Sequence, residues 1–167
     1  MNLNNNCETI NQYSEHYDDP PKRVRKASRG LVIDDDKILL SYEVNTDVYM
    51  SPGGGVEVGE TLEACCVREL LEETGYIVKP VKPFVIINEY CFETMYESNY
   101  FICEITGTGE RTPTDSEIEH GTVPVWMKIN KALEIFKNQA SKGEDIRSLY
   151  TRELTVLNKY LSEEKSE

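Results

Sequence analysis

The feature that most constrains the fold is a run of three glycines that leads into one sharply bounded helix. Gly53–Gly55 follows Ser51-Pro52, and three adjacent residues without a Cβ predict an irregular loop rather than a regular element. The segment from Thr61 to Thr74 is predicted as a helix, because Thr61 is a favourable N-cap and Gly75 a favourable stop. The chain must therefore bring a glycine loop close to the start of a helix.

Within this helix the charged and apolar side chains occupy separate faces. At about 100° per residue, Glu69, Glu72 and Glu73 share one arc of the surface. The apolar arc, which can pack on a sheet, contains Ala64, Val67, Leu70 and Leu71. Carboxylates at these separations repel one another by roughly 1–3 kcal/mol per pair. Either this face is a solvated acidic surface, or it binds a divalent cation such as Mg²⁺ or Mn²⁺, which prefers hard oxygen ligands.

The rest of the sequence predicts strands around this helix and two helices after it. Extended segments are predicted over 24–33, 37–44, 76–95, 100–105 and 123–129, with a turn at 34–36, a hairpin tip at 97–99 and a loop over 107–121. Helices are predicted from Asn130 to Phe136 and from about Asp145 onward. This order predicts an α/β sandwich, in which a mixed sheet is covered by helices on both faces.

The chain length of 167 residues fits one domain with short ends. Residues 1–22 are polar and rich in asparagine, and they predict a flexible N-terminal lead-in. The domain itself is expected over 23–162, and residues 163–167 are expected to form a C-terminal tail.

The charge balance narrows the set of partners. A formal net charge of −12 repels phosphate backbones, so binding to duplex nucleic acid is not expected. Phosphorylated small molecules are compatible with this charge, because a divalent cation inverts the local field. No segment approaches the roughly 20 apolar residues that a membrane-spanning helix needs, so no membrane partner is expected.

The cysteine pattern bears on the cellular compartment. The chain has five cysteines, two of them adjacent and none in a CxxC pair, which fits neither a disulfide framework nor a structural zinc site. The N-terminus lacks the basic start and apolar run of a signal peptide. These observations predict reduced cysteines in the cytoplasm.

The spacing around the helix resembles a known family motif. Reading from Gly54, five residues precede Glu60 and seven more precede Arg68, which is followed by Glu-Leu-Leu-Glu-Glu-Thr-Gly-Tyr76. This segment closely resembles the Nudix box of the Nudix (MutT-type) hydrolases, G-x5-E-x7-R-E-U-x-E-E-x-G-U, where U is bulky and apolar. Tyr76 is the single departure, aromatic where the family usually has an aliphatic residue.

The resemblance implies a Nudix fold and hydrolysis of a diphosphate linkage in a nucleoside diphosphate derivative, of the NTP, dNTP or nucleotide-sugar type. It implies that Mg²⁺ or Mn²⁺ is bound by Glu69, Glu72 and Glu73 and by the backbone carbonyl of Gly53. Glu69 or Glu72 would also act as the base for the attacking water. Either assignment is compatible with the sequence.

Further roles come from residues beside this metal set. The resemblance implies that Arg68 supports catalysis by pairing with Glu60 and bracing the helix against the glycine loop. Many members of the family add an acidic residue from a loop outside the box. Glu117 and Glu119 are the candidates here, and we expect Glu119 to reach the metal because it lies closer to the strand that contains Trp126.

An alternative function is a Nudix-fold sensor or regulatory module that binds a nucleotide without turnover. Such proteins usually have eroded box glutamates or an added DNA-binding domain, whereas all four box glutamates are intact in this chain. The resemblance also makes a homodimer a reasonable expectation, because dimers are common in the family.

Overall fold

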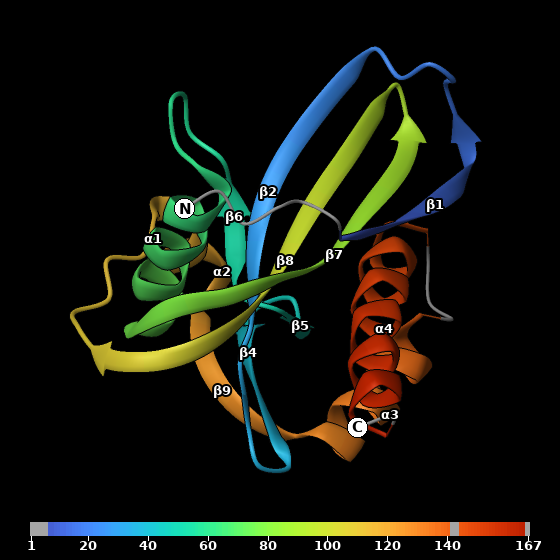
Figure 1. The fold of residues 1–167 in the computed structure, drawn as a ribbon. Coiled ribbons are helices and arrows are strands. Elements are labelled where there is room, and N and C mark those ends of the chain that lie inside the picture. The colour runs from blue at the N-terminus through green and yellow to red at the C-terminus, as the bar shows by residue number, and fades with distance from the viewer. Residues whose placement is uncertain (1–6, 141–143, 166–167) are drawn as a thin grey trace.

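A computed structural model of the chain describes residues 7–140 and 144–165, and it contains two sheets and four helices within them (Figure 1). The strands are β1 Glu8–Tyr17, β2 Arg23–Leu31, β3 Ile33–Asp34, β4 Lys37–Glu43, β5 Val48–Met50, β6 Gly53–Gly55, β7 Tyr76–Phe92, β8 Thr94–Thr108 and β9 Thr122–Lys128. The helices are α1 Leu62–Thr74, α2 Asp115–His120, α3 Ile129–Gln139 and α4 Glu144–Glu164.

The larger sheet has five strands in the order β1-β7-β8-β2-β6. Its centre is the long antiparallel β7–β8 hairpin, while β1 joins β7 and β2 joins β8 in parallel. In the smaller sheet, β4 pairs antiparallel with β3 and β5 along one edge and with β9 along the other. The larger sheet therefore contains both parallel and antiparallel pairs, and it is mixed, as the sequence predicts.

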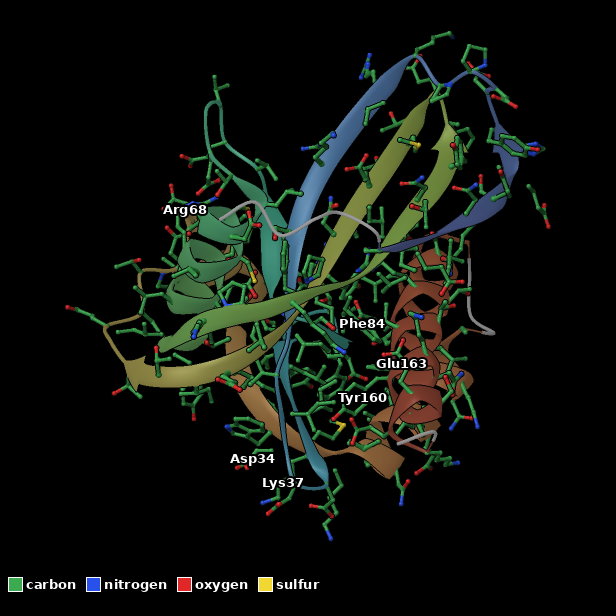
Figure 2. All side chains as sticks on the ribbon, viewed as in Figure 1. Asp34, Lys37, Arg68, Phe84, Tyr160 and Glu163 are labelled. Carbon is green, nitrogen blue, oxygen red and sulfur yellow. The ribbon has the colours of Figure 1, made fainter. Side chains whose placement is uncertain are left out.

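Helices cover both faces of this sheet structure. Figure 1 shows α1 on one side of the strands and α3 and α4 on the other. One core cluster joins the sheet to α3 and α4, and a second, around Leu70, joins it to α1. Phe84 of β7 and Tyr160 of α4 meet across the first interface, with ring centroids 6.4 Å apart (Figure 2). The predicted α/β sandwich is confirmed.

The N-terminal segment differs from its prediction. Residues 8–17 form strand β1 instead of a flexible lead-in, and they pair with β7 from Glu8↔Val85 onward. The side chains of Ile10, Gln12 and Ser14 alternate inward, which is the strand period. Two of these three inward residues are polar, and Gln12 Nε2 donates to Thr155 Oγ1 at 3.0 Å. The apolar alternation that marks a strand is therefore missing from the sequence.

Three local predictions are also corrected. The β7–β8 hairpin turns at Glu93 rather than over 97–99, and Phe92 adopts a positive φ of 50° before it. Gly53–Gly55 is a short strand, β6, because its backbone pairs with that of β2. The predicted loop over 107–121 is strand β8 as far as Thr108 and contains helix α2.

The C-terminal helices are longer than predicted. Helix α3 begins at Ile129, with Lys128 at its N-cap in place of Asn130, and continues to Gln139. Helix α4 extends to Glu164 and so includes the first residues of the predicted tail, whereas residues 166 and 167 lie outside the described part. Within the described residues, no helix is both long enough and apolar enough to cross a membrane.

Candidate active site

Helix α1 has the predicted boundaries, and both of its ends are capped. The Thr61 hydroxyl accepts from the Ala64 N–H at 3.1 Å, and Gly75 adopts a left-handed conformation with φ 75° while its N–H donates to the Leu71 carbonyl. Both caps are therefore confirmed. The apolar side of α1 packs on the sheet, and its opposite side carries the box glutamates toward β6.

The glycines of β6 allow the backbone to approach α1 closely. A Cβ at Gly54 would overlap the Glu69 carboxyl group, whose Cδ lies 2.6 Å from that position. Gly53 has a φ of 146°, and a Cβ there would lie 2.7 Å from the Cα of Arg29. Any larger side chain at either position would push the glycine segment away from α1 or from β2.

Arg68 links α1 to this glycine segment (Figure 2). Its guanidinium donates to both carboxylate oxygens of Glu60, at 2.8 and 2.9 Å, and to the Gly55 carbonyl at 3.1 Å. The predicted Arg68–Glu60 ion pair is confirmed, and it lowers the pKa of Glu60 to about 2. Arg68 also pairs with Glu69 at 2.7 Å and Glu72 at 3.2 Å.

The main acidic group in the described part of the chain combines α1 with α2. Carboxylate oxygens of Glu69, Glu73 and Glu117 all lie within 4.8 Å of one another. The structure thus places Glu117, and not Glu119, at this group, which differs from the expectation that Glu119 reaches the metal. The two residues belong to a helix rather than to a loop, and positions two apart on a helix face different directions. Glu119 instead accepts from Asn45 Nδ2 through its main-chain carbonyl, at 2.7 Å.

Burial makes the charge on this group costly. Glu69 and Glu73 are only 9% and 8% exposed. Burial raises the pKa of Glu73 to about 8, against the opposing effect of the Ser41 hydroxyl that donates to it. Burial also raises the pKa of Glu69, against the opposing effect of Arg68. The negative charge of Glu117 acts in the same direction as burial on both groups.

The remaining residues of the predicted site lie next to this group. The Gly53 N–H donates to Glu73 Oε2 at 3.3 Å, so the glycine segment and Glu73 are in direct contact. Glu72 lies on the more exposed side of α1, where its side chain is 25% exposed and paired with Arg68. The structure therefore brings Gly53, Glu69 and Glu73 together, with Glu72 at the rim.

Two functional contacts had no signal in the sequence. Ser41 on β4 donates to Glu73, and Arg29 Nη1 on β2 contacts the carbonyls of Ser51 and Gly53 at 3.2 and 3.5 Å. Both contacts join segments that are far apart along the chain, the first β4 to α1 and the second β2 to the glycine segment. Glu117, in contrast, had a readable signal, because Thr114 and Glu117 form a capping box at the start of α2.

The aromatic residue that departs from the box motif has a structural explanation. The Tyr76 hydroxyl accepts from Trp126 Nε1 at 3.0 Å, and the two rings meet edge-on with centroids 6.0 Å apart. An aliphatic side chain at this position would leave the indole N–H without this partner. Tyr76, the first residue of β7, thus links the start of this strand to β9.

The chemistry of the acidic group fits a divalent cation. Three carboxylates supply hard oxygen ligands of the kind that Mg²⁺ and Mn²⁺ prefer. Two of them are buried beside a third negative charge, and a cation would relieve both the burial cost and the mutual repulsion. The same group without a cation would be a net cost to the fold.

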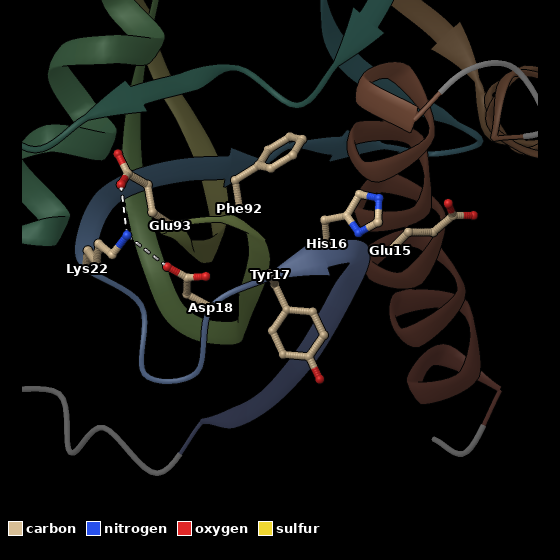
Figure 3. Close-up of a pocket in the computed structure, with 7 residues that line it drawn as sticks. All are labelled: Glu15, His16, Tyr17, Asp18, Lys22, Phe92 and Glu93. Atoms are coloured by element: carbon tan, nitrogen blue, oxygen red, sulfur yellow. Dashed lines mark ion pairs between the residues drawn. The ribbon is translucent and has the colours of Figure 1, made fainter.

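Two hollows open on the larger sheet. One, of about 170 Å³, reaches Gly54 and Gly55 of the candidate site, and four cationic side chains line it: Arg25, Lys26, Arg29 and Arg152. Another, of about 520 Å³, lies at the far end of the sheet, lined by side chains from the end of β1 and the β7–β8 turn, among which Lys22 pairs with Asp18 and Glu93 (Figure 3). Only the former hollow adjoins the acidic group.

Comparisons with known proteins agree with this geometry. The family model described as NUDIX domain matches residues 24–149. A Bacillus subtilis (strain 168) protein, named as a proposed 8-oxo-dGTP diphosphatase, is 32% identical over 111 residues, which cover 62% of this chain and 73% of that protein. An ADP-ribose pyrophosphatase of Methanocaldococcus jannaschii is 47% identical over 53 residues, but these cover only 30% of this chain and 31% of that enzyme.

A solved structure supports the fold assignment. The NUDIX hydrolase from Nitrosomonas europaea superposes with a TM-score of 0.61 at 21% identity, covering 83% of this chain and 88% of that one. The family match spans the strands from β2 to β9, α1 and the residues that surround the acidic group, whereas β1 lies before it. The chain is a member of the Nudix hydrolase family.

Proposed function

We propose that this protein is a metal-dependent pyrophosphohydrolase that cleaves a diphosphate linkage in a nucleoside diphosphate derivative. The observation that carries the proposal is the group formed by Glu69, Glu73 and Glu117, whose carboxylate oxygens lie within 4.8 Å of one another beside the glycine segment. Like charges at this separation, two of them buried, are hard to explain by stability alone. They are the expected feature of a cation-binding site.

In this proposal Glu69, Glu73 and Glu117 hold Mg²⁺ or Mn²⁺, with the Gly53 carbonyl and Glu72 as further candidate ligands. The cation, when bound, neutralises charge on the phosphoryl oxygens of the substrate and lowers the pKa of bound water. Glu117 takes the place that the sequence assigned to Glu119. Its supporting observation is its position in the group, where its charge raises the pKa of both α1 carboxyls.

The remaining box residues orient this group and handle the proton of the attacking water. Glu72 and Glu69 both lie on the face of α1 that Arg68 contacts, and one of them accepts that proton. Glu72 is the more exposed of the two and so the better placed to exchange a proton with solvent. Arg68 and Glu60 keep α1 at a fixed distance from β6, which is a positioning role.

The cationic hollow beside Gly54 supports an anionic substrate. Four cationic side chains line it, although the chain as a whole has a formal net charge of −12. Lys26 pairs with Glu97 of the same hollow and Arg152 pairs with Glu89 and Glu153, so Arg25 and Arg29 are the cations that these pairs leave for an anionic ligand. Coulomb attraction at such a site offsets the repulsion that the rest of the surface exerts on a phosphorylated molecule. The substrates in the names of the two relatives, 8-oxo-dGTP and ADP-ribose, are both nucleoside diphosphate derivatives. We assign the substrate of this chain to the same chemical class.

The proposal places the protein in the cytoplasm, acting on a small molecule rather than on duplex nucleic acid. All five cysteines are free thiols, and Cys66 and Cys103 remain unbonded although their Sγ atoms are 3.7 Å apart. This arrangement suits a reducing compartment. A homodimer stays a prediction, and light scattering coupled to gel filtration would test it.

The experiment that tests the proposed function is a turnover screen with metal control. Purified protein would be incubated with Mg²⁺ or Mn²⁺ and with dGTP, 8-oxo-dGTP, ADP-ribose or a UDP-sugar, and nucleoside monophosphate would be measured by ion-exchange chromatography. We expect one of these classes to be hydrolysed, EDTA to abolish the reaction and added cation to restore it. Undiminished turnover in excess EDTA would refute the proposal. Nucleotide binding by calorimetry without any turnover would indicate a sensor instead.

A further inference from the structure

Helix α4 contacts β5 and Ser51, which lead into the glycine segment, through residues outside the Nudix box. Among the described residues strand β5 pairs with β4 alone, so the outward N–H groups of Tyr49 and of Ser51, which follows β5, need other partners. Two side chains of α4, one helical turn apart, supply them. The Tyr150 hydroxyl accepts from the Tyr49 N–H at 3.0 Å, and the Glu153 carboxylate accepts from the Ser51 N–H at 3.2 Å.

The Glu153 carboxylate is held from several directions. Its Oε2 accepts from the Ser51 hydroxyl at 2.6 Å as well as from the Ser51 N–H. Its Oε1 accepts from the Tyr100 hydroxyl at 3.0 Å and from Arg152 Nη2 at 3.1 Å. The residue is 2% exposed. A carboxylate fixed by this many donors, two of them from one residue, is a rigid anchor for that residue.

Ser51 leads directly into the candidate site. Pro52 follows it with a fixed φ, and the next residue, Gly53, donates its N–H to Glu73 at 3.3 Å. Arg29 Nη1 contacts the carbonyls of Ser51 and Gly53, which keeps the two residues at one spacing. A shift of Ser51 would therefore move Gly53 relative to Glu73.

We infer that Glu153 is a positioning residue, which holds Ser51 and thereby keeps Gly53 beside Glu73 in the arrangement that binds the cation. The inference rests on the proposed function, since it concerns the same acidic group. Glu153 does not touch that group itself and acts through Ser51. It also lies beyond residue 149, where the match to the family model ends, so this anchor belongs to the part of the chain outside that match.

A purely structural role for Glu153 predicts a different outcome, and Tyr150 provides the matched control. Tyr150 lies three residues before Glu153 on the same helix, contacts Tyr49, two residues before Ser51, and is fully buried. Tyr150→Phe removes the hydroxyl that accepts from Tyr49. If α4 only stabilises the fold, Tyr150→Phe and Glu153→Gln should have the same consequences for the glycine segment.

The test compares wild type, Ser51→Ala, Glu153→Gln, the double variant and Tyr150→Phe, all free of metal at the start. Glu153→Gln is expected to fold, because Arg152 keeps its ion pair with Glu89 at 2.8 Å. Ser51→Ala is the smaller change and remains informative if Glu153→Gln does not fold. Amide hydrogen exchange over residues 50–56 and Mn²⁺ binding by calorimetry are measured on each protein.

We expect Glu153→Gln to speed exchange over residues 50–56 by about tenfold and to weaken Mn²⁺ binding by about tenfold or more, as losses of supporting contacts around metal ligands do. Ser51→Ala should act in the same direction, and the double variant should be little worse than Glu153→Gln alone. Tyr150→Phe should lower the melting temperature but leave Mn²⁺ affinity unchanged.

Unchanged Mn²⁺ affinity in both Ser51→Ala and Glu153→Gln would overturn the inference, as would an equal loss in Tyr150→Phe. Failure of the proposed function looks different. In that case wild-type protein would not bind Mn²⁺ at all, and both the proposed function and the inference would fall together.

Discussion

Helices α1 and α4 both carry charged side chains into the interior, but the charges differ in their partners: those of α4 form ion pairs, and those of α1 lie mainly beside like charges. In α4, Arg152 pairs with Glu89 at 2.8 Å and with Glu153 at 3.1 Å, and the partners are at most 7% exposed. In α1, Glu69 and Glu73 lie beside a third carboxylate, that of Glu117. Arg68 pairs with Glu69 at 2.7 Å but also with Glu60 and Glu72, so this one cation does not balance the charge of the group.

The difference distinguishes two roles of buried charge: the ion pairs of Arg152 stabilise the fold, whereas the acidic group is suited to bind a cation. A buried ion pair whose polar atoms all have hydrogen-bond partners needs no further ligand, and removal of either partner lowers the free energy of unfolding. Clustered carboxylates with too few counter-ions oppose folding, and burial raises the pKa of Glu73 to about 8. Substitution of the acidic residues of α1 should therefore act mainly on activity, and substitution of Arg152 on α4 mainly on stability.

The largest expected effect is on activity, at Glu73. Glu73→Gln keeps the size of the side chain and its contacts with neutral donors but removes a ligand charge. We expect turnover with Mg²⁺ or Mn²⁺ to fall on the order of a thousandfold, about 4 kcal/mol of transition-state stabilisation. Metal-free stability, measured by urea denaturation, should be unchanged or higher, because the cost of either ionising or protonating this buried carboxyl is gone.

Glu63→Gln is the control for this experiment, since Glu63 lies in the first turn of the same helix and outside the acidic group. It should leave turnover near the wild-type rate. A Glu73→Gln protein with full activity would show that the acidic face of α1 is only a polar surface.

The next effect is on stability, at Arg152. Arg152→Met leaves Glu89 and Glu153 buried without their shared cation, so we expect the free energy of unfolding to drop by about 3–5 kcal/mol. Urea denaturation measures it. Lys131→Met on α3 breaks the exposed ion pair with Glu134 and should cost less than about 1 kcal/mol. Similar losses in the two variants would mean that burial does not distinguish the α4 pair from a surface pair.

The smallest effect distinguishes the two acidic residues of α2. Glu117→Gln should slow turnover by about tenfold, or about 1.4 kcal/mol, because its carboxylate belongs to the group with Glu69 and Glu73. Glu119→Gln should be nearly silent. Steady-state kinetics at saturating metal would measure both. Loss of activity in Glu119→Gln alone would mean that α2 turns when substrate binds, so that the sequence-based choice was correct for the working enzyme.

The parts of the site that could be predicted from sequence are those encoded within a few residues. Thr61 and Gly75 set the ends of α1 through local backbone preferences, and the spacing of the three glutamates places them on one face. The Arg68–Glu60 pair follows from the same box. The alternation of strands and helices was sufficient for the fold class, because an apolar helix face and an apolar sheet face must cover each other.

The parts that could not be predicted depend on pairing between distant segments. Strand β1 has polar inward residues, and its partners on β7 and α4 are unknown until the chain is folded. Ser41 and Arg29 reach the site only because β4 and β2 lie beside it. The choice of Glu119 over Glu117 differs from the observed geometry for a local reason, since the capping box that begins α2 was present in the sequence and makes the segment helical.

Helix α4 covers the open edge of β5, so the smallest fragment that should remain monodisperse must include this helix. A fragment that stopped at residue 149 would contain the whole region matched to the family model, yet it would lack both Tyr150 and Glu153. The outward N–H groups of Tyr49 and Ser51 would then be open to pairing with another molecule. Unsatisfied strand edges of this kind recruit partners and lead to aggregation. For expression, crystallisation or grafting, the domain should therefore be taken through the end of α4.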